Sequence, residues 1–334
     1  MNISEIEHKL TQLITSENEA NVLLAFEMAK GNPQIQQALH QVLQAYYEIY
    51  LCLIDPDSTS MQDMQVADIL SFNQTKLEVR NNDVTQVPSQ IARLQNLETL
   101  NLSFNAITEL PAAVGQLTQL KNLVLRFNQL TQLPNEVTQL IELTWLDLQG
   151  NLLVELPPAI VHLQNLKNLH LSQNQLTNLP PEIGYLQALD TLDVERNQLT
   201  ALPEEIGQLT QLKVLQLEHN QIKELPASIG KLKNLQLMRL IHNELEDLPK
   251  DLSKLQKVYT IDLDNNGLQH LPPSICQLSN LTSLSLTNNQ ITQLPETIQQ
   301  LDKLRFLNLT GNPIADSTIK QVEEWLPICR VTFN

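Results

Sequence analysis

Asparagine recurs every 23 residues through most of this 334-residue chain, without an insertion or a deletion. The members of this asparagine column are Asn82, Asn105, Asn128, Asn151, Asn174, Asn197, Asn220, Asn243, Asn266, Asn289 and Asn312. The text around them recurs as well, in the frame LxxLxxLxLxxNxLxxLPxxIxx. A fixed period of this length predicts a stack of repeats, because each unit can bury its apolar face only against its neighbours.

Each repeat contains an xLxLx segment in which apolar and polar residues alternate, as a strand with one inward face does. Neighbouring strands are expected to be parallel, since each is reached by one turn of the coil. The LPxxI segment lies on the opposite side, and its proline fixes φ and removes a donor. We therefore expect short 3₁₀ or extended turns there. Because strands pack more closely than bulky outer segments, the sheet should line a concave face.

The chain is predicted to have three parts. Residues 1–70 carry helical apolar spacing, residues 71–314 hold eleven repeats of which the first is degenerate, and residues 315–334 form a C-terminal cap of helix and strand. Two interpretations of the first part stay open. It caps the open face of the first repeat, or it is an acidic docking module, since ten Asp and Glu accompany only Lys9 and Lys30.

The LxxLxLxxNxL core resembles the leucine-rich repeat family, and the LPxxIxxLxx portion is similar to its 23-residue class. That class includes bacterial proteins and the Ras-group proteins of plants and animals. The resemblance covers about residues 71–334. It implies an α/β fold, a right-handed horseshoe solenoid whose concave face binds proteins. Cysteine-rich caps typical of extracellular animal members are absent from this sequence, which favours the intracellular or bacterial branch.

Composition excludes several function classes. A formal net charge of −16 argues against nucleic-acid binding and against anionic membrane surfaces. Cys52, Cys276 and Cys329 are scattered and odd in number, so they indicate neither a disulfide framework nor a zinc site. The first residues lack the pattern of a signal peptide and no run is long enough to span a membrane, so we expect a cytoplasmic protein. No P-loop, nucleophile elbow or HExxH motif is present, so we expect neither a cofactor nor catalysis.

Function is therefore expected at the variable positions of the strands, where the middle repeats depart from small hydroxyl and amide residues. Trp145 is a candidate hot spot, since Trp is enriched among such residues. Val214, Leu237 and Ile241 should form an apolar patch beside Arg239. The predicted partner-binding residues are Trp145, Asp147, His170, Asp193, Glu195, Val214, Glu218, Leu237, Arg239, Ile241, Asp262 and Asp264.

Like charges are adjacent among these residues. Glu195 and Glu218 lie on neighbouring repeats, and Asp262 and Asp264 lie along one strand. Such pairs destabilise a sheet unless a cation neutralises them. We therefore expect a protein partner with a basic patch and an apolar knob.

An alternative is a metal-dependent or enzymatic site at Asp147, His170 and Asp193, which occupy one row about 5 Å apart. A solvated polar row is the simpler interpretation, because no fourth ligand is fixed. Docking through the acidic N-terminal helices is the other alternative. Phe104 and Phe127, which precede column asparagines, are interpreted as edge packing.

Overall fold

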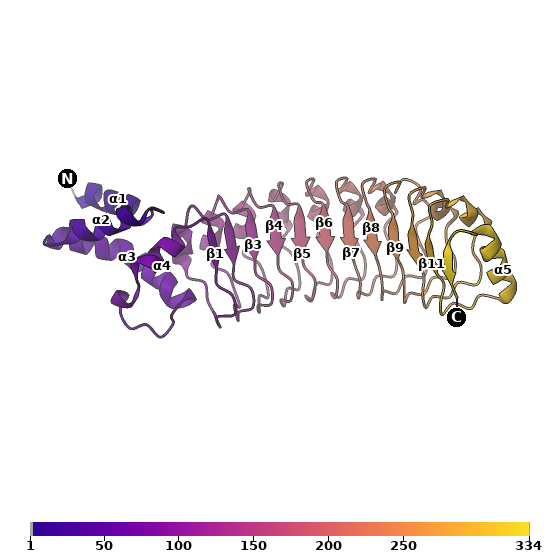
Figure 1. Ribbon diagram of the computed structural model, residues 1–334, viewed down its shortest axis with the longest axis horizontal. Helices are drawn as coiled ribbons and strands as arrows, with labels where there is room; N and C mark the ends of the chain where they lie inside the picture. The colour runs from indigo at the N-terminus through magenta and orange to yellow at the C-terminus, as the bar shows by residue number, and fades with distance from the viewer. Residues whose placement is uncertain (1–2, 334) are drawn as a thin grey trace. The chain divides into compact units, whose positions relative to one another are not determined.

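The computed structural model describes residues 3–333 of the chain. Two compact units are present, unit 1 (Met1–Leu146) and unit 2 (Asp147–Asn334). Unit 1 contains the N-terminal helices and the first repeats, and unit 2 contains the remaining repeats and the C-terminal helix (Figure 1). The division at residue 146 differs from the predicted boundaries at residues 70 and 314, and the three-part organisation remains a prediction.

Unit 1 begins with helices, as predicted. They are α1 (Ile3–Ile14), α2 (Glu19–Ala29), α3 (Pro33–Leu53), the 3₁₀ turn η1 (Met61–Asp63) and α4 (Val66–Phe72). The cap of α2 is Asn18, whose side chain accepts the Ala20 N–H at 2.9 Å. Asn32 caps α3 in the same way, with Pro33 in the first turn. Side-chain oxygens at these positions satisfy N–H groups that a helix start leaves unpaired.

The helices cover the first repeat, as a cap does. Helix α3 contacts the 3₁₀ segment η2 (Ser89–Arg93), and α4 contacts the first strand. The Asn82 side chain donates to the Leu53 carbonyl at 2.8 Å. Buried Asn73 accepts the Tyr46 hydroxyl at 2.7 Å and donates to the Ile14 carbonyl at 2.5 Å. These bonds join helices that are distant in sequence, so the cap interpretation is supported, while a docking role is a separate question.

The strands of the described residues form one sheet whose order follows the sequence. Pairs β1 to β3 in unit 1 and β5 to β12 in unit 2 are parallel, with equivalent residues side by side, such as Leu192 and Leu215. The strands are β1 (Lys76–Glu78), β2 (Thr99–Asn101), β3 (Asn122–Val124), β4 (Trp145–Asp147), β5 (Asn168–His170), β6 (Thr191–Asp193), β7 (Val214–Gln216), β8 (Leu237–Arg239), β9 (Thr260–Asp262), β10 (Ser283–Ser285), β11 (Phe306–Asn308) and β12 (Arg330–Thr332).

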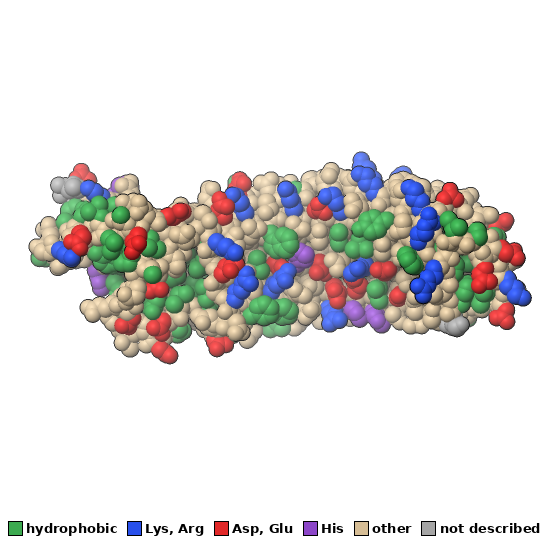
Figure 2. Space-filling view, in the orientation of Figure 1, with side chains coloured by type: hydrophobic (Ala, Val, Ile, Leu, Met, Phe, Trp, Pro, Cys, Tyr) green, Lys and Arg blue, Asp and Glu red, His purple; other side chains and the backbone are tan. Residues whose placement is uncertain are grey.

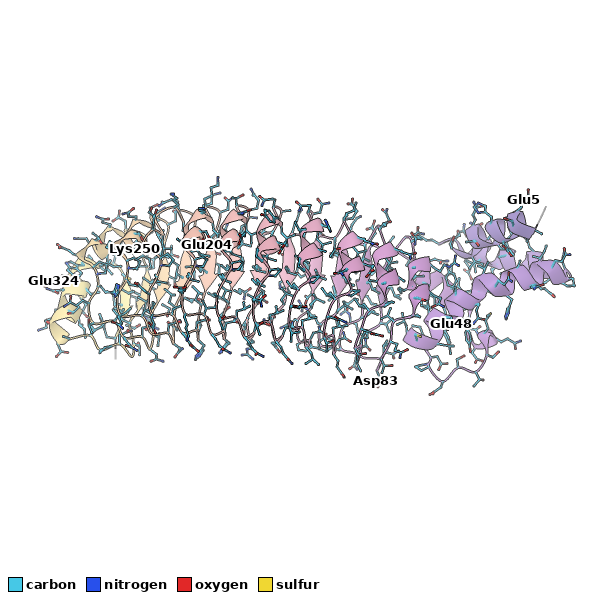
Figure 3. All side chains as sticks on the ribbon, turned by 180° about the vertical axis from the view of Figure 1, so that it is seen from behind. Glu5, Glu48, Asp83, Glu204, Lys250 and Glu324 are labelled. Carbon is cyan, nitrogen blue, oxygen red and sulfur yellow. The ribbon has the colours of Figure 1, made fainter. Side chains whose placement is uncertain are left out.

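Most of the LPxxI segments form 3₁₀ turns, as predicted, each entered from a proline; the corresponding segment at residues 248–252 forms none. Figure 3 shows this side of the molecule, with Glu204 labelled in one such turn. After η2 the turns are η3 (Ala112–Gln116), η4 (Asn135–Gln139), η5 (Pro158–His162), η6 (Pro181–Tyr185), η7 (Glu204–Gln208), η8 (Ala227–Lys231), η9 (Pro273–Gln277) and η10 (Glu296–Gln300). Leucine, isoleucine and valine side chains between strands and turns are almost all fully buried and form the core.

The asparagine column holds the repeats together through backbone bonds, as expected. Asn174 is representative: its Nδ2 donates to the Leu148 and Leu171 carbonyls at 2.9 Å. Its Oδ1 accepts the Leu153 N–H at 3.0 Å. Each side chain therefore satisfies groups of two successive turns of the coil that would otherwise be buried without partners.

The C-terminal cap is a helix followed by a strand, as predicted. Helix α5 (Asp316–Trp325) contacts η10, and β12 continues the sheet beside β11. No helix within residues 3–333 combines the length and the apolar character that crossing a bilayer requires. The predicted fold class is confirmed: an α/β repeat solenoid with a parallel sheet and helical caps at both ends.

Candidate functional site

The strand face is the side of the sheet opposite the leucine core. Eleven of the twelve predicted partner-binding residues lie on the strand face of unit 2, between Asp147 and Asp264. Trp145 lies in unit 1, half-buried at the start of β4. Acidic side chains gather over β6 to β9, beside a group of hydrophobic ones (Figure 2).

Some carboxylates of the strand face are far less accessible than their outward positions predict. Asp147 is fully buried and Glu218 is 6% exposed, whereas Glu195 is half-buried. The Asp193 Oδ1 accepts the Glu195 N–H at 3.0 Å, and Asp147 accepts the N–H two residues further on at 3.3 Å. These two side chains fold back onto their own backbone, so the expectation that they are freely exposed is wrong.

Asp264 makes the same kind of bond to the next repeat. Its Oδ1 accepts the Thr287 N–H at 2.7 Å. Backbone N–H groups stabilise an ionised carboxylate, and the carboxylate in turn fixes the loop that carries it. Part of the acidic row therefore has a structural role that the sequence pattern did not reveal.

Arg239 neutralises two of the adjacent acids. Its Nη1 lies 3.7 Å from Glu218 Oε1, and its Nε lies 3.5 Å from Asp262 Oδ2. The register of β7, β8 and β9 places the arginine between these two neighbours. The prediction that like charges here must be met by a partner is therefore corrected, because a cation of the chain itself already compensates two of them.

The compensation is incomplete. Burial raises the pKa of Glu218, and the neighbouring charge of Glu195 raises it further, against the opposite effect of Arg239. Burial also raises the pKa of Asp262, and Asp264 adds to the shift. Removing water from a carboxylate disfavours its charged form. A further cation placed over this face would therefore find carboxylates that gain from its approach.

The apolar patch is continuous. Val214 and Leu237 are directly paired across β7 and β8, and Ile241 follows β8 by two residues. All three are half-buried, so they present apolar area beside the Arg239 network without being fully exposed. This combination of an aliphatic surface and a charged border is typical of interaction sites.

The geometry does not support the alternative metal site. His170 Nδ1 lies 3.6 Å from Asp193 Oδ2, so the predicted row is real. Among residues 3–333, however, no three His, Cys, Asp or Glu side chains are arranged to hold a metal ion. Asp147 and Asp193 direct an oxygen toward backbone N–H groups instead, which explains why the row does not converge on one point.

Two exposed ring pairs were missed by sequence reasoning. Phe104 and Phe127 stack with ring centroids 4.9 Å apart, and they are 52% and 37% exposed. His219 and His242 stack at 4.5 Å in unit 2. All four have positive φ and directly precede a column asparagine. The two phenylalanine rings pack on each other across adjacent repeats, in agreement with their interpretation as edge packing.

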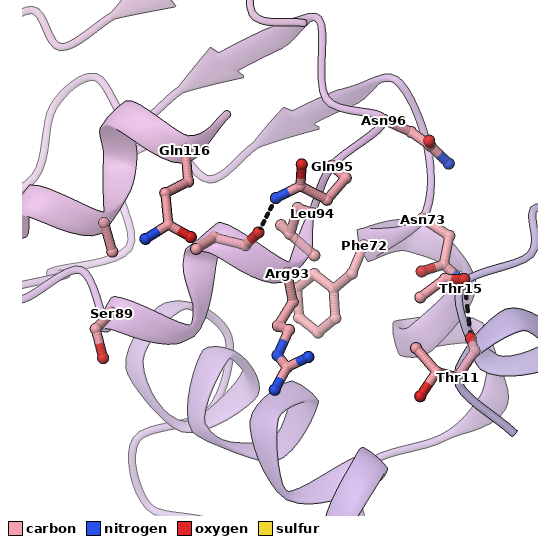
Figure 4. A pocket seen from close by; sticks show the side chains of 12 residues that line it. Thr11, Thr15, Phe72, Asn73, Ser89, Arg93, Leu94, Gln95, Asn96 and Gln116 are labelled. Carbon is pink, nitrogen blue, oxygen red and sulfur yellow. Dashed lines mark hydrogen bonds between the residues drawn. The ribbon is translucent and has the colours of Figure 1, made fainter. Parts of the chain in front are cut away.

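A cavity of about 630 Å³ lies in unit 1, away from the strand face. Figure 4 shows it between α1, α4 and the first 3₁₀ turns, with Thr11, Phe72 and Arg93 in its lining. Arg93 is the one charged residue among its lining residues, and the rest are the aromatic Phe72 and hydroxyl, amide and aliphatic side chains. No residue of the predicted site lines this cavity.

Family models match most of the repeats. A model described as a leucine-rich repeat region matches residues 164–244. A second model, leucine rich repeat, matches residues 73–130, 118–176 and 256–314. No curated protein matches the chain.

Several solved structures are similar. A leucine-rich repeat protein of Leptospira interrogans is 33% identical over 81% of this chain and 86% of that one, with a TM-score of 0.46. The plant peptide hormone receptor RGFR1, solved with RGF2, is 25% identical over 80% of this chain and 49% of the receptor, with a TM-score of 0.68. The ectodomain of the Arabidopsis thaliana receptor kinase GASSHO1/SCHENGEN3, solved with CASPARIAN STRIP INTEGRITY FACTOR 2, is 26% identical over 79% and 39%, with a TM-score of 0.61.

Proposed function

Because the chain belongs to the leucine-rich repeat family, we propose that it is a non-catalytic scaffold that binds a protein partner on the strand face of unit 2. The similar plant receptors are solved with RGF2 and with CASPARIAN STRIP INTEGRITY FACTOR 2, which makes recognition of another polypeptide the natural expectation. The observation that carries the proposal is the Val214, Leu237 and Ile241 patch beside the Glu218–Arg239–Asp262 network.

The partner should present a basic patch and an apolar knob. Asp193, Glu195 and Asp264 add acidic side chains at the border of the patch, and Arg239 is already shared between two other acids. Glu195 has a counterion in the exposed Arg196, whose Nε lies 3.0 Å from its Oε1, and an exposed pair of this kind contributes little. Charged borders of this kind set orientation and association rate, while the aliphatic centre contributes most of the affinity.

Glu195→Lys tests the role of charge, with Glu204→Lys as its matched control. Both residues lie on the same repeat and carry the same charge change, but Glu204 lies in η7, on the opposite side (Figure 3). Partners captured from native lysate of the source organism should be lost with Glu195→Lys and retained with Glu204→Lys. Equal recovery by both folded variants would contradict the proposal.

Leu237→Asp tests the aliphatic centre. Leu237 is half-buried on the strand face, so an aspartate there removes apolar area without opening the core. The same partners should be lost, and binding should weaken with salt in the wild type because the border is charged. Retention of all partners by Leu237→Asp would place the binding surface elsewhere.

We also propose a cytoplasmic location. Cys52, Cys276 and Cys329 are free thiols whose pKa burial raises, so they are little ionised and weakly reactive. Free, unreactive thiols suit a reducing compartment. Fractionation of the source cells followed by immunoblotting tests this, and recovery in the secreted fraction would contradict it.

Trp145 stays a predicted partner contact of unit 1.

A further inference from the structure

Helix α2 has an unusual surface. Its sequence, EANVLLAFEMA, is apolar on almost every side, and a helix of that kind is normally covered on every side. Val22, Ala25 and Ala29 are buried against the rest of unit 1. Leu23 and Leu24, however, are 45% and 47% exposed. Figure 2 shows hydrophobic side chains exposed over the N-terminal helices with acidic ones among them.

A groove of about 670 Å³ begins at this helix. Its apolar lining comes from Phe26 of α2, Leu43 and Tyr47 of α3, and Met61 and Met64 of the following segment. The other lining residues are polar: His40, Gln44, Thr59, Ser60 and Gln62. Phe26, Tyr47 and Met61 are half-buried, so their apolar atoms are within reach of a ligand. Methionine and aromatic side chains adapt to different apolar partners, because the thioether is flexible and polarizable.

The surroundings of the groove are acidic. Between residues 10 and 75 the sequence has eight Asp and Glu residues and one cation, Lys30. Lys30 already pairs with Glu27 at 2.5 Å. Glu48, one turn beyond the groove residue Gln44 on α3, accepts a bond from it at 2.8 Å, and Asp57 is exposed in the adjoining loop. The lining itself holds no Asp or Glu and includes His40, so a cationic ligand would meet these carboxylates at the border of the groove rather than inside it.

We propose that this groove binds an amphipathic helix whose polar face carries lysine and arginine. The apolar face of such a helix would fill the space between Phe26 and Met61, and its basic residues would lie near Glu48 and Asp57. A helix fits better than an extended segment, because the groove is formed by α2 and α3 and offers no strand edge for pairing. This site is separate from the strand face, and its residues all belong to unit 1.

The test uses two labelled 18-residue synthetic peptides with leucines at identical helical positions. One carries lysine on its polar face and the other carries glutamate. Fluorescence anisotropy with the full chain should show saturable binding of the lysine peptide and at least tenfold weaker binding of the glutamate peptide. Affinity for the lysine peptide should fall between 50 mM and 500 mM salt. Equal binding of the two peptides, or no binding of either, would overturn the proposal.

Met61→Lys and Leu24→Lys locate the site. Met61 lies in the groove, whereas Leu24 is exposed on α2 and does not line it. Both variants add one positive charge, and unchanged far-UV circular dichroism will show that both are folded. We expect at least tenfold weaker binding of the lysine peptide to Met61→Lys and a change below threefold for Leu24→Lys. The opposite order would place the peptide on the outer side of α2 and refute the groove.

Glu195→Lys separates this site from the strand face, which is also acidic. The lysine peptide should bind this variant as tightly as the wild type. A loss with Glu195→Lys but not with Met61→Lys would show that the peptide binds the strand face, which would refute the groove and leave the proposed function intact.

Discussion

The Arg239 guanidinium lies 3.7 Å from the Glu218 carboxylate, measured from Nη1 to Oε1, although Glu218 itself is only 6% exposed. The same side chain reaches Asp262 on the other neighbouring repeat at 3.5 Å. One arginine is therefore the counterion of two partly desolvated carboxylates, one on each neighbouring repeat. The stability of these repeats and their surface charge depend on the same residue.

Replacing Arg239 by methionine should destabilise unit 2. The apolar stem is retained, but Glu218 and Asp262 lose their counterion. Breaking a buried pair typically costs 3–5 kcal/mol, and the 42% exposure of the arginine side chain reduces this to about 1–2 kcal/mol. Urea unfolding measures the difference. Adding Glu218→Gln should restore most of the loss, and a double variant no better than the single one would contradict this explanation.

Stability should respond to pH through Glu218, whose pKa is raised chiefly by burial from a usual value of 4.5. A carboxyl with a raised pKa binds its proton more tightly in the folded state. Its contribution to stability is therefore full below the unfolded pKa and is lost as pH rises through the folded value. We expect Glu218→Gln to unfold at higher urea concentration than the wild type at pH 7, with no such gain at pH 4. Glu204→Gln, in an exposed position, is the control for net charge.

The asparagine column should tolerate substitution poorly. Asn174→Ala removes two donors and one acceptor from groups buried between successive turns. Leaving such groups unpaired costs about 1–3 kcal/mol each, so a loss of at least about 2 kcal/mol is expected. Asn178→Ala, an exposed asparagine of the same repeat, should change the urea midpoint little. Similar midpoints for the two variants would show that the column is not structural.

The unbroken period explains how much of the fold could be predicted. Since Asn174 and every other column residue fix the phase, strands, 3₁₀ turns and the buried leucines follow from position alone. The direction in which a strand-face side chain points cannot be predicted from its position in the repeat. Asp193 bonds to the backbone of its own repeat, whereas Asp262, at the same position of the repeat frame, lies 3.5 Å from Arg239 of the neighbouring repeat.

The backbone conformation of the exposed ring pairs could have been predicted from the sequence. In two repeats the residue before the column asparagine is a glycine, Gly150 or Gly311, and both glycines have positive φ. Glycine at a repeated position indicates a left-handed backbone there. Every repeat shares this conformation, so Phe104 and Phe127 adopt it too and stack on each other. The Arg239 network had no comparable signal, since it depends on side-chain reach between three repeats.

Phe127→Asn should cost little stability. The φ of Phe127 is 51°, a conformation that asparagine adopts more readily than phenylalanine. The lost stacking with Phe104 is worth about 0.5–1.5 kcal/mol, so the net change should stay below about 1 kcal/mol. Leu125→Ala, two residues earlier in the core, should cost about 2–5 kcal/mol by comparison. A loss as large for Phe127→Asn would mean that the exposed pair is part of the core after all.

Close packing of the 3₁₀ turns gives a prediction that depends on single atoms. A Cβ added at Gly207 in η7 would lie 2.5 Å from the Ser228 carbonyl oxygen and 2.6 Å from the Ser228 Cβ. Neither neighbour is the end of a flexible side chain, so the two turns must separate, at about 1–3 kcal/mol. At Gly267 the nearest atom, the Leu245 oxygen, is 3.3 Å away. Gly267→Ala should therefore lower the urea midpoint much less than Gly207→Ala does, and equal midpoints would show that the turns can move apart freely.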